Sequence, residues 1–191
     1  MKAPTKRDEI LEAALELIAE RGFHGAPMAM IAEKAGVGAG TIYRYFETKE
    51  ALIRQLFEEL KAKLMATLLA DHPAERPARE RFFHLWKALF RYLIANPLHF
   101  RYLEQYHNSP YGVAQHRDRL LNKPEEQDPI RDLFEEGVEQ QILKNLPVLV
   151  IFSLAFGPLF GLIQDQLNGF IEMDDDLTER IAEACWDALK R

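Results

Sequence analysis

The sequence predicts an all-α protein of about nine helices, with a small head at the N-terminus and a larger body behind it. Apolar residues recur at three- and four-residue spacing along most of the chain. Gly, Pro or polar turn residues interrupt each periodic stretch, as they do where helices end. One closely spaced pair of short helical stretches, within residues 28–46, has the pattern of a helix-turn-helix motif. We therefore expect a head over residues 1–47 and a body over residues 48–191.

The composition is that of a soluble protein with enough apolar residues for a sizeable core. The chain has 191 residues, of which 48% are hydrophobic and 28% charged. Its net charge of −6 argues against nonspecific coating of nucleic acid, so any DNA-binding field must be local. The single cysteine, Cys185, excludes an internal disulfide. Since the N-terminus also lacks an apolar signal region, we expect a cytoplasmic protein.

The first helix is predicted from Thr5 to Gly22. Thr5 is a suitable N-cap, and Asp8 follows at the position that completes a capping box. An apolar stripe then runs along one face of the helix. Gly22 is expected to end this helix.

Two short helices around a tight turn follow. In the first, Met28, Ile31 and Ala32 share one face, and Gly36 ends the helix because glycine accepts the left-handed conformation. In the second, Ile42 and Phe46 are four residues apart and face the core together. That orientation turns a face of small and polar residues outward, with an arginine that can reach a base or a phosphate and two tyrosines that can donate to phosphate. The exposed face is expected to enter a major groove of DNA.

These residues strongly resemble the N-terminal region of the tetracycline-repressor (TetR/AcrR) family of bacterial transcription regulators. The matching pieces are Ile31-Ala32, Ala35-Gly36-Val37, Gly40-Thr41-Ile42-Tyr43, Phe46 and Lys49. The resemblance covers about the first quarter of the chain. Beyond that quarter only the general arrangement of predicted helices is similar. Two departures stand out: Pro27-Met28 lacks the usual Thr or Ser cap, and Gly38-Ala39 replaces the usual Ser-Lys.

The resemblance implies a homodimer that binds a near-palindromic operator and leaves it when a small molecule enters the body. It also implies that Lys49 meets a DNA phosphate from the start of the next helix. We expect DNA contacts from Met28, Ala39, Gly40, Thr41, Tyr43, Arg44, Tyr45 and Lys49.

A long helix joins the head to the body. It begins after Thr48, a plausible N-cap, and spans roughly 23 residues, or about 34 Å. His72, Pro73 and Pro77 break its pattern and mark a connection.

The following helices are rich in aromatic residues. Aromatic residues at helical spacing most often belong to the hydrophobic core. As a set, mixed with a few polar groups, they also suit a pocket for an apolar or aromatic ligand. The candidate ligand-binding residues are Trp86, Phe90, Tyr102, Gln105, Tyr106, His107, Phe134, Phe152 and Phe156. The six histidines lack metal-binding spacing, so neither a metal nor another cofactor is expected.

Residues 146–163 contain no charge and are long enough for a membrane span. Prolines and glycines within them, and the absence of flanking basic clusters, favour a helix buried on one side by the body and on the other by a partner subunit. A final helix with a stripe of Ile181, Ala184, Cys185 and Ala188 permits close packing. We expect these last two helices to form the homodimer interface, with no membrane contact.

The sequence thus predicts a ligand-responsive DNA-binding regulator, and no enzyme. A ligand-independent DNA-binding protein would share the head but have a solid body. A helical enzyme that uses the aromatic cavity is a weaker alternative, because the chain has no phosphate loop, nucleophile motif or metal spacing.

Overall fold

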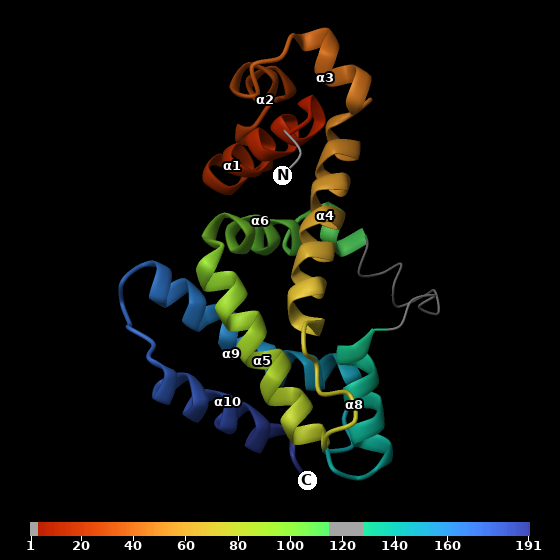
Figure 1. The fold of residues 1–191 in the computed structure, drawn as a ribbon, viewed down its shortest axis with the longest axis vertical. Coiled ribbons are helices and arrows are strands. Elements are labelled where there is room, and N and C mark those ends of the chain that lie inside the picture. The colour runs from red at the N-terminus through yellow and green to blue at the C-terminus, as the bar shows by residue number, and fades with distance from the viewer. Residues whose placement is uncertain (1–3, 115–127) are drawn as a thin grey trace. The chain divides into compact units, whose positions relative to one another are not determined.

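The computed structural model describes residues 4–114 and 128–191, and in these ranges the chain is helical with no strand. The prediction of an all-α fold is confirmed (Figure 1). A single antiparallel bridge joins Leu143 and Lys190 in the described residues. The helices are α1 (Lys6–Gly25), α2 (Met28–Lys34), α3 (Ala39–Tyr45), α4 (Lys49–Leu69), α5 (Ala78–Ala95), α6 (Pro97–His107), α8 (Pro129–Glu139), α9 (Val148–Leu167) and α10 (Asp175–Leu189).

The chain forms two compact units that are interleaved in sequence. The first unit comprises the described parts of Met1–Lys63 and Asn96–Asn122, and the second those of Leu64–Ala95 and Lys123–Arg191. The predicted head, residues 1–47, lies within the first unit. The division at residues 47 and 48 stays a prediction.

Local sequence signals explain how α1 begins and where it breaks. The Thr5 hydroxyl accepts a hydrogen bond from the Asp8 backbone N–H at 3.3 Å, and the Asp8 carboxylate accepts one from the Thr5 N–H at 2.9 Å. This is the predicted capping box. Near the other end, Gly22 has a φ of 73°, which interrupts the regular helix before it resumes to Gly25. An L-residue with a side chain rarely adopts this conformation, so glycine is needed at the break.

In the first unit α1 packs against both α2 and α6, and α4 packs against α6. Ile10, Ile18 and Ile31 are fully buried in this unit. The Tyr102 hydroxyl donates to the Ile53 carbonyl at 2.6 Å, and the Tyr106 ring stacks on Phe57 with centroids 4.0 Å apart. Helix α6 is therefore tied to α1 and α4 by both apolar packing and hydrogen bonds.

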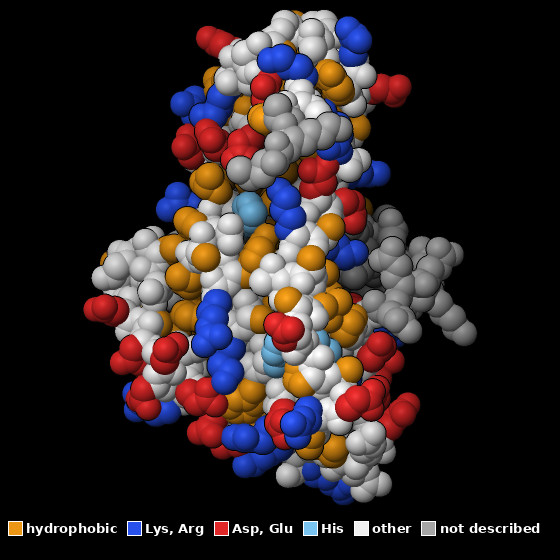
Figure 2. Space-filling model, in the orientation of Figure 1, with side chains coloured by type: hydrophobic (Ala, Val, Ile, Leu, Met, Phe, Trp, Pro, Cys, Tyr) orange, Lys and Arg blue, Asp and Glu red, His pale blue; other side chains and the backbone are white. Residues whose placement is uncertain are grey.

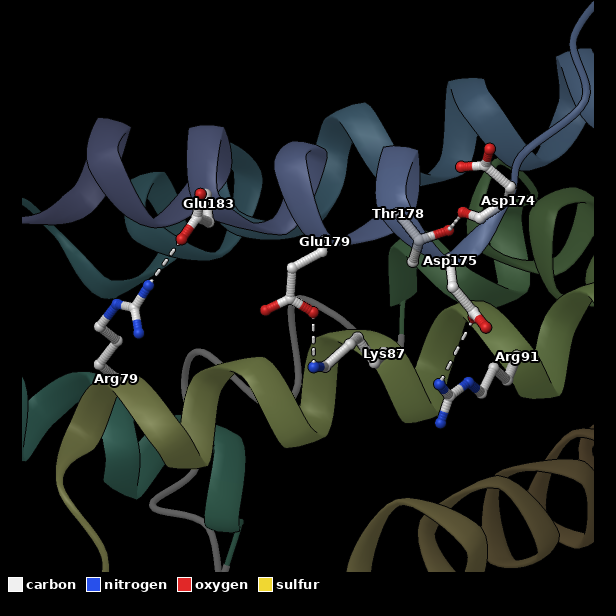
Figure 3. A network of polar contacts seen from close by, with 8 residues as sticks. All are labelled: Arg79, Lys87, Arg91, Asp174, Asp175, Thr178, Glu179 and Glu183. Carbon is white, nitrogen blue, oxygen red and sulfur yellow. Dashed lines mark hydrogen bonds and ion pairs between the residues drawn. The ribbon is translucent and has the colours of Figure 1, made fainter.

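In the second unit α5 packs against α8, α9 and α10 around an aromatic core. The Trp86 indole N–H donates to the Ala155 carbonyl at 3.1 Å, which fixes α5 on α9. Ion pairs also join α5 to the antiparallel α10 (Figure 3). They are Arg79–Glu183 at 2.9 Å, Lys87–Glu179 at 2.8 Å and Arg91–Asp175 at 3.8 Å. Because these side chains are largely exposed, the pairs set the register of the helices more than they stabilise the fold.

Helix α9 is long and apolar enough to cross a membrane by length and composition alone, and 28% of its most apolar window is buried in the chain. It runs through Pro158 without ending. Its outward side chains include Leu149, Val150, Phe152, Leu154 and Phe160, each between 38% and 45% exposed. An exposed apolar face of this kind is typical of interaction surfaces.

Candidate functional site

Helix α3 presents an exposed face over a buried anchor. Ile42 is fully buried and Phe46, which follows the helix, is 4% exposed. Tyr43 and Tyr45 are 52% and 45% exposed, and Arg44 between them is also exposed. Thr41 is half-buried. The orientation expected from the spacing of Ile42 and Phe46 is the one observed.

The start of α3 is open to an approaching molecule. Gly38, Ala39 and Gly40 are all exposed. A Cβ atom added at Gly38 or Gly40 would meet no other atom of the described chain within 4 Å. Packing inside the protein therefore does not require glycine at either position, and the small residues leave room for a close external contact.

Helices α2 and α3 lack side-chain N-caps in the structure, as the sequence indicated. Pro27 and Gly38 occupy the N-cap positions of α2 and α3, and neither makes a side-chain capping hydrogen bond. The Met28 side chain is only 8% exposed. Any DNA contact from this position must therefore come from its backbone.

Lys49 begins α4 and is tied to the end of α1. Its ammonium group donates a hydrogen bond to the Phe23 carbonyl. Burial lowers the pKa of Lys49 from its ordinary value. The side chain is half-buried, so the predicted phosphate contact requires it to share or exchange this internal bond.

The candidate ligand-binding residues of the second unit are placed close together. Trp86, Phe134 and Phe156 are at most 1% exposed, and Phe90 is 6% exposed. The Phe134 and Phe156 centroids are 6.0 Å apart, and those of Trp86 and Phe90 are also 6.0 Å apart. Phe152 contacts Phe156 at 5.0 Å but is 42% exposed, on the outer side of α9.

The remaining candidates lie on α6, in the first unit. Beyond the Tyr102 bond to Ile53, the Gln105 side chain donates to the Ala19 carbonyl at 3.3 Å. The His107 Nδ1 atom lies 2.7 Å from the Leu103 carbonyl. Burial raises the pKa of both Tyr102 and Tyr106, which keeps their hydroxyls neutral. Of the polar side chains expected to orient a ligand, those of Tyr102, Gln105 and His107 thus already have hydrogen-bond partners within this unit.

Sequence reasoning missed two groups of residues. Phe23 contacts the rings of Tyr102 and Tyr111, at centroid distances of 6.0 Å and 5.6 Å, besides accepting the Lys49 bond. His72 and Arg81 belong to a basic cluster of the second unit, although His72 was read only as part of a connection. Within residues 4–114 and 128–191, no group of three or more His, Cys, Asp or Glu side chains is arranged to hold a metal ion.

Two family models match the chain. Residues 10–56 match the model described as bacterial regulatory proteins, tetR family. Residues 77–190 match the model described as tetracyclin repressor-like, C-terminal domain. The second match covers more than half of the chain and the first covers the helix-turn-helix.

Curated relatives are similar over nearly their whole length. An uncharacterized HTH-type transcriptional regulator of Haemophilus influenzae is 27% identical over 185 residues, which are 96% of this chain and 95% of the relative. An HTH-type transcriptional repressor of Mycobacterium tuberculosis is 30% identical over 180 residues, which are 92% and 86% of the two chains.

Solved structures share the fold. A TetR-family transcription regulator from Shewanella sp. PV-4 has a TM-score of 0.84 and 26% identity, over 98% of this chain and 100% of that one. The regulator FadR from Bacillus subtilis, solved in complex with stearoyl-CoA, has a TM-score of 0.69 and 24% identity, over 94% and 95%.

Proposed function

Because the chain belongs to the TetR family of bacterial transcriptional regulators, we propose that it is a cytoplasmic repressor released from its operator by a small apolar or aromatic effector. The family consists of DNA-binding regulators, so it gives no support to a helical enzyme. The Mycobacterium tuberculosis relative, itself a repressor, favours repression over activation.

The exposed face of α3 carries the DNA-binding part of the proposal. Arg44, Tyr43 and Tyr45 project from a helix whose opposite side is anchored by Ile42. The arginine can donate to a guanine edge or to a phosphate, and the phenols can donate to flanking phosphates. Ala39, Gly40 and Thr41 are small enough to let the helix approach the base edges. The proposed contacts are those of Ala39, Gly40, Thr41, Tyr43, Arg44, Tyr45 and Lys49, with the backbone of Met28.

We propose a homodimer through α9 and α10. The outward face of α9 is apolar along much of the helix, and Gly157 and Gly161 on it have open space in front of them. On α10, Ala184 and Ala188 are exposed. A second copy of the same two helices would cover both faces by two-fold symmetry. Two reading helices would then meet a near-palindromic operator.

The aromatic residues of the body support an apolar effector. In the second unit, the proposed ring surface comes from Trp86, Phe90, Phe134, Phe152 and Phe156. In the first unit, Tyr102, Gln105, Tyr106 and His107 stay separate candidates for ligand contacts. The Bacillus subtilis regulator was solved with stearoyl-CoA, so a protein of this fold can bind a ligand that carries a long apolar chain. Effector and DNA binding would be coupled by one free energy, and each would weaken the other.

The test is to select genomic fragments that bind the purified protein and to measure their affinity. We expect one enriched near-palindromic sequence, bound at least about tenfold more weakly by Arg44→Ala. A protein that enriches no sequence over a nonspecific background is not an operator-binding repressor.

Two observations favour the ligand-independent alternative. The aromatic rings of the second unit contact one another directly, and in the first unit the Tyr102 hydroxyl already donates a hydrogen bond to the Ile53 carbonyl. A panel of apolar compounds distinguishes the two functions. A ligand that binds the folded protein raises its melting temperature by mass action and should release the selected operator. If no compound raises the melting temperature or releases the operator, the protein is a ligand-independent DNA-binding protein and the proposal is wrong.

A further inference from the structure

A basic cluster lies in the second unit beside its aromatic core. His72 follows α4, and Arg81 and His84 are on α5. Of all buried side-chain nitrogens and oxygens in the described residues, two lack a hydrogen-bond partner: His72 Nδ1 and Arg81 Nε. Buried polar groups in native proteins are nearly always paired. Two unpaired nitrogens in a single cluster therefore indicate a hydrogen-bonding partner from outside the described residues.

Two other polar atoms of the cluster have partners. His84 Nε2 lies 3.1 Å from the Leu68 carbonyl, which can only accept, so this nitrogen carries the proton. The Arg81 Nη1 atom donates to a Glu136 carboxylate oxygen at 2.6 Å. The His72 and His84 ring centroids are 5.5 Å apart.

The histidine and the arginine are close enough to influence each other. Burial, then the charges of His84 and Arg81, lower the pKa of His72. The Arg81 side chain is only 13% exposed, so its charge is poorly screened. A cation at this place would be repelled by the guanidinium, which excludes a metal bound by the two imidazoles.

The free donors define the chemistry of the missing group. Arg81 Nε can only donate, and His72 Nδ1 donates when it carries the ring proton. The group must accept hydrogen bonds. The buried guanidinium favours an anion, because the Glu136 carboxylate that pairs with it is 48% exposed and offsets its charge only in part. Glu136 limits the negative charge of the bound group, because its carboxylate repels a dianion more strongly than a monoanion. A single carboxylate satisfies all of these conditions.

We propose that Arg81 and His72 bind the carboxylate of a monocarboxylic acid. This inference rests on the proposed function in one respect: it takes the acid to be the effector, and the carboxylate to be its polar end. Phe82, the next residue on α5, is fully buried, and its ring contacts Phe156 and Trp186. The aromatic core of the second unit thus includes the residue that follows Arg81 on α5, and we propose that its side chains meet the apolar part of such an acid.

Calorimetry on the full-length protein tests the site with matched pairs of compounds. The first pair is 3-phenylpropionate and 3-phenyl-1-propanol, and the second is decanoate and 1-decanol, so each pair differs only in its polar end. We expect each acid to bind at least about tenfold more tightly than its alcohol. In Arg81→Gln and His72→Ala this preference should fall to about twofold or less.

Two further variants separate binding from folding. Arg79→Gln removes an arginine two positions away that pairs with the exposed Glu183, and it should leave the preference unchanged. Glu136→Gln keeps both donors and removes the repulsion, so it should increase the affinity for the acid. A purely structural role of the cluster does not produce this increase.

The inference is overturned if the unmutated protein shows no preference for either acid, if Arg81→Gln keeps the preference, or if Glu136→Gln weakens acid binding. Inorganic phosphate that competes as well as the acid would overturn the carboxylate assignment. Operator release is measured separately. An acid that binds through Arg81 but leaves the operator bound supports the site and removes only its role as effector site.

Discussion

The Lys49 ammonium group donates a hydrogen bond to the backbone carbonyl of Phe23, which joins the start of α4 to the end of α1 across 26 residues of sequence. The Phe23 ring is at the same time held by Tyr102 of α6. A residue expected to serve DNA binding thus also ties together the two helices that flank the helix-turn-helix. This double role leads to the first prediction.

Lys49→Ala should lower the free energy of unfolding by about 1–3 kcal/mol, because the partly buried Phe23 carbonyl loses a charged donor. Urea titration of the unfolding transition measures this. Lys6→Ala is the control, since Lys6 is exposed and pairs with Glu9 three residues further on, and it should change stability by less than about 0.5 kcal/mol.

The same variant tests the proposed phosphate contact. If Lys49 also meets a phosphate, the slope of log K against log salt should become about 0.9 less steep in Lys49→Ala. An unchanged slope with lower stability would mean that Lys49 acts only through Phe23.

Arg44→Ala and Tyr43→Phe should affect DNA binding in different ways. Loss of a base contact by Arg44 should cost about 1–3 kcal/mol and relax the sequence preference at one position of each half-site. Loss of a phosphate contact by Tyr43 should weaken binding equally on all sequences. Competition binding on single-base variants of the selected operator distinguishes these results. Equal loss on every variant for Arg44→Ala would contradict its base-reading role.

Gly161→Glu and Ala184→Glu should each disrupt the proposed dimer, because they place a charge in an apolar interface. An obligate interface of this kind buries more than about 2,000 Å². Sedimentation at micromolar concentration should give a dimer for the unmutated protein and monomers or aggregates for the variants. Asn145→Glu, in the exposed loop before α9, is the control and should stay dimeric. A stable monomer of the unmutated protein would rule out this interface as an obligate one.

The stability of the first unit should fall as the pH drops below the ordinary histidine range. Burial, and then the charge of Lys63, lower the pKa of His99 below its usual value of 6.5. The unfolded chain therefore binds a proton that the folded chain resists, and stability is lost as the pH falls from about 6.5 toward the folded pKa. His99→Gln should flatten the pH dependence of urea unfolding between about pH 7.5 and 5.5. A curve that is equally steep with and without His99 would contradict this assignment.

Features set by neighbours in sequence were predictable. The capping box joins residues three apart, and the burial of Ile42 and Phe46 follows from a spacing of four. The helix break at Gly22 was also anticipated, although α1 resumes after it. These features depend on local geometry, which the residue pattern specifies directly.

Features set by distant residues were not predictable. The hydrogen bonds of the Tyr102 and Gln105 side chains to the carbonyls of Ile53 and Ala19 were not foreseen, and the role of both residues in a ligand pocket stays a prediction. The partner of Lys49 and the proximity of Arg81 to His72 depend likewise on how helices pack. Helical periodicity shows which face is buried, but not which backbone carbonyl a side chain will meet.

The interleaving of the two units bears on protein engineering. The chain leaves the first unit at Lys63 and returns at Asn96, so the unit that holds the reading helix is discontinuous in sequence. A chimera that exchanges only residues 1–47 with a relative would separate α1 from the α6 with which it evolved. Exchange of residues 96–114 together with the head preserves that contact. The same layout implies that a ribosome must release α6 before the first unit can complete its core.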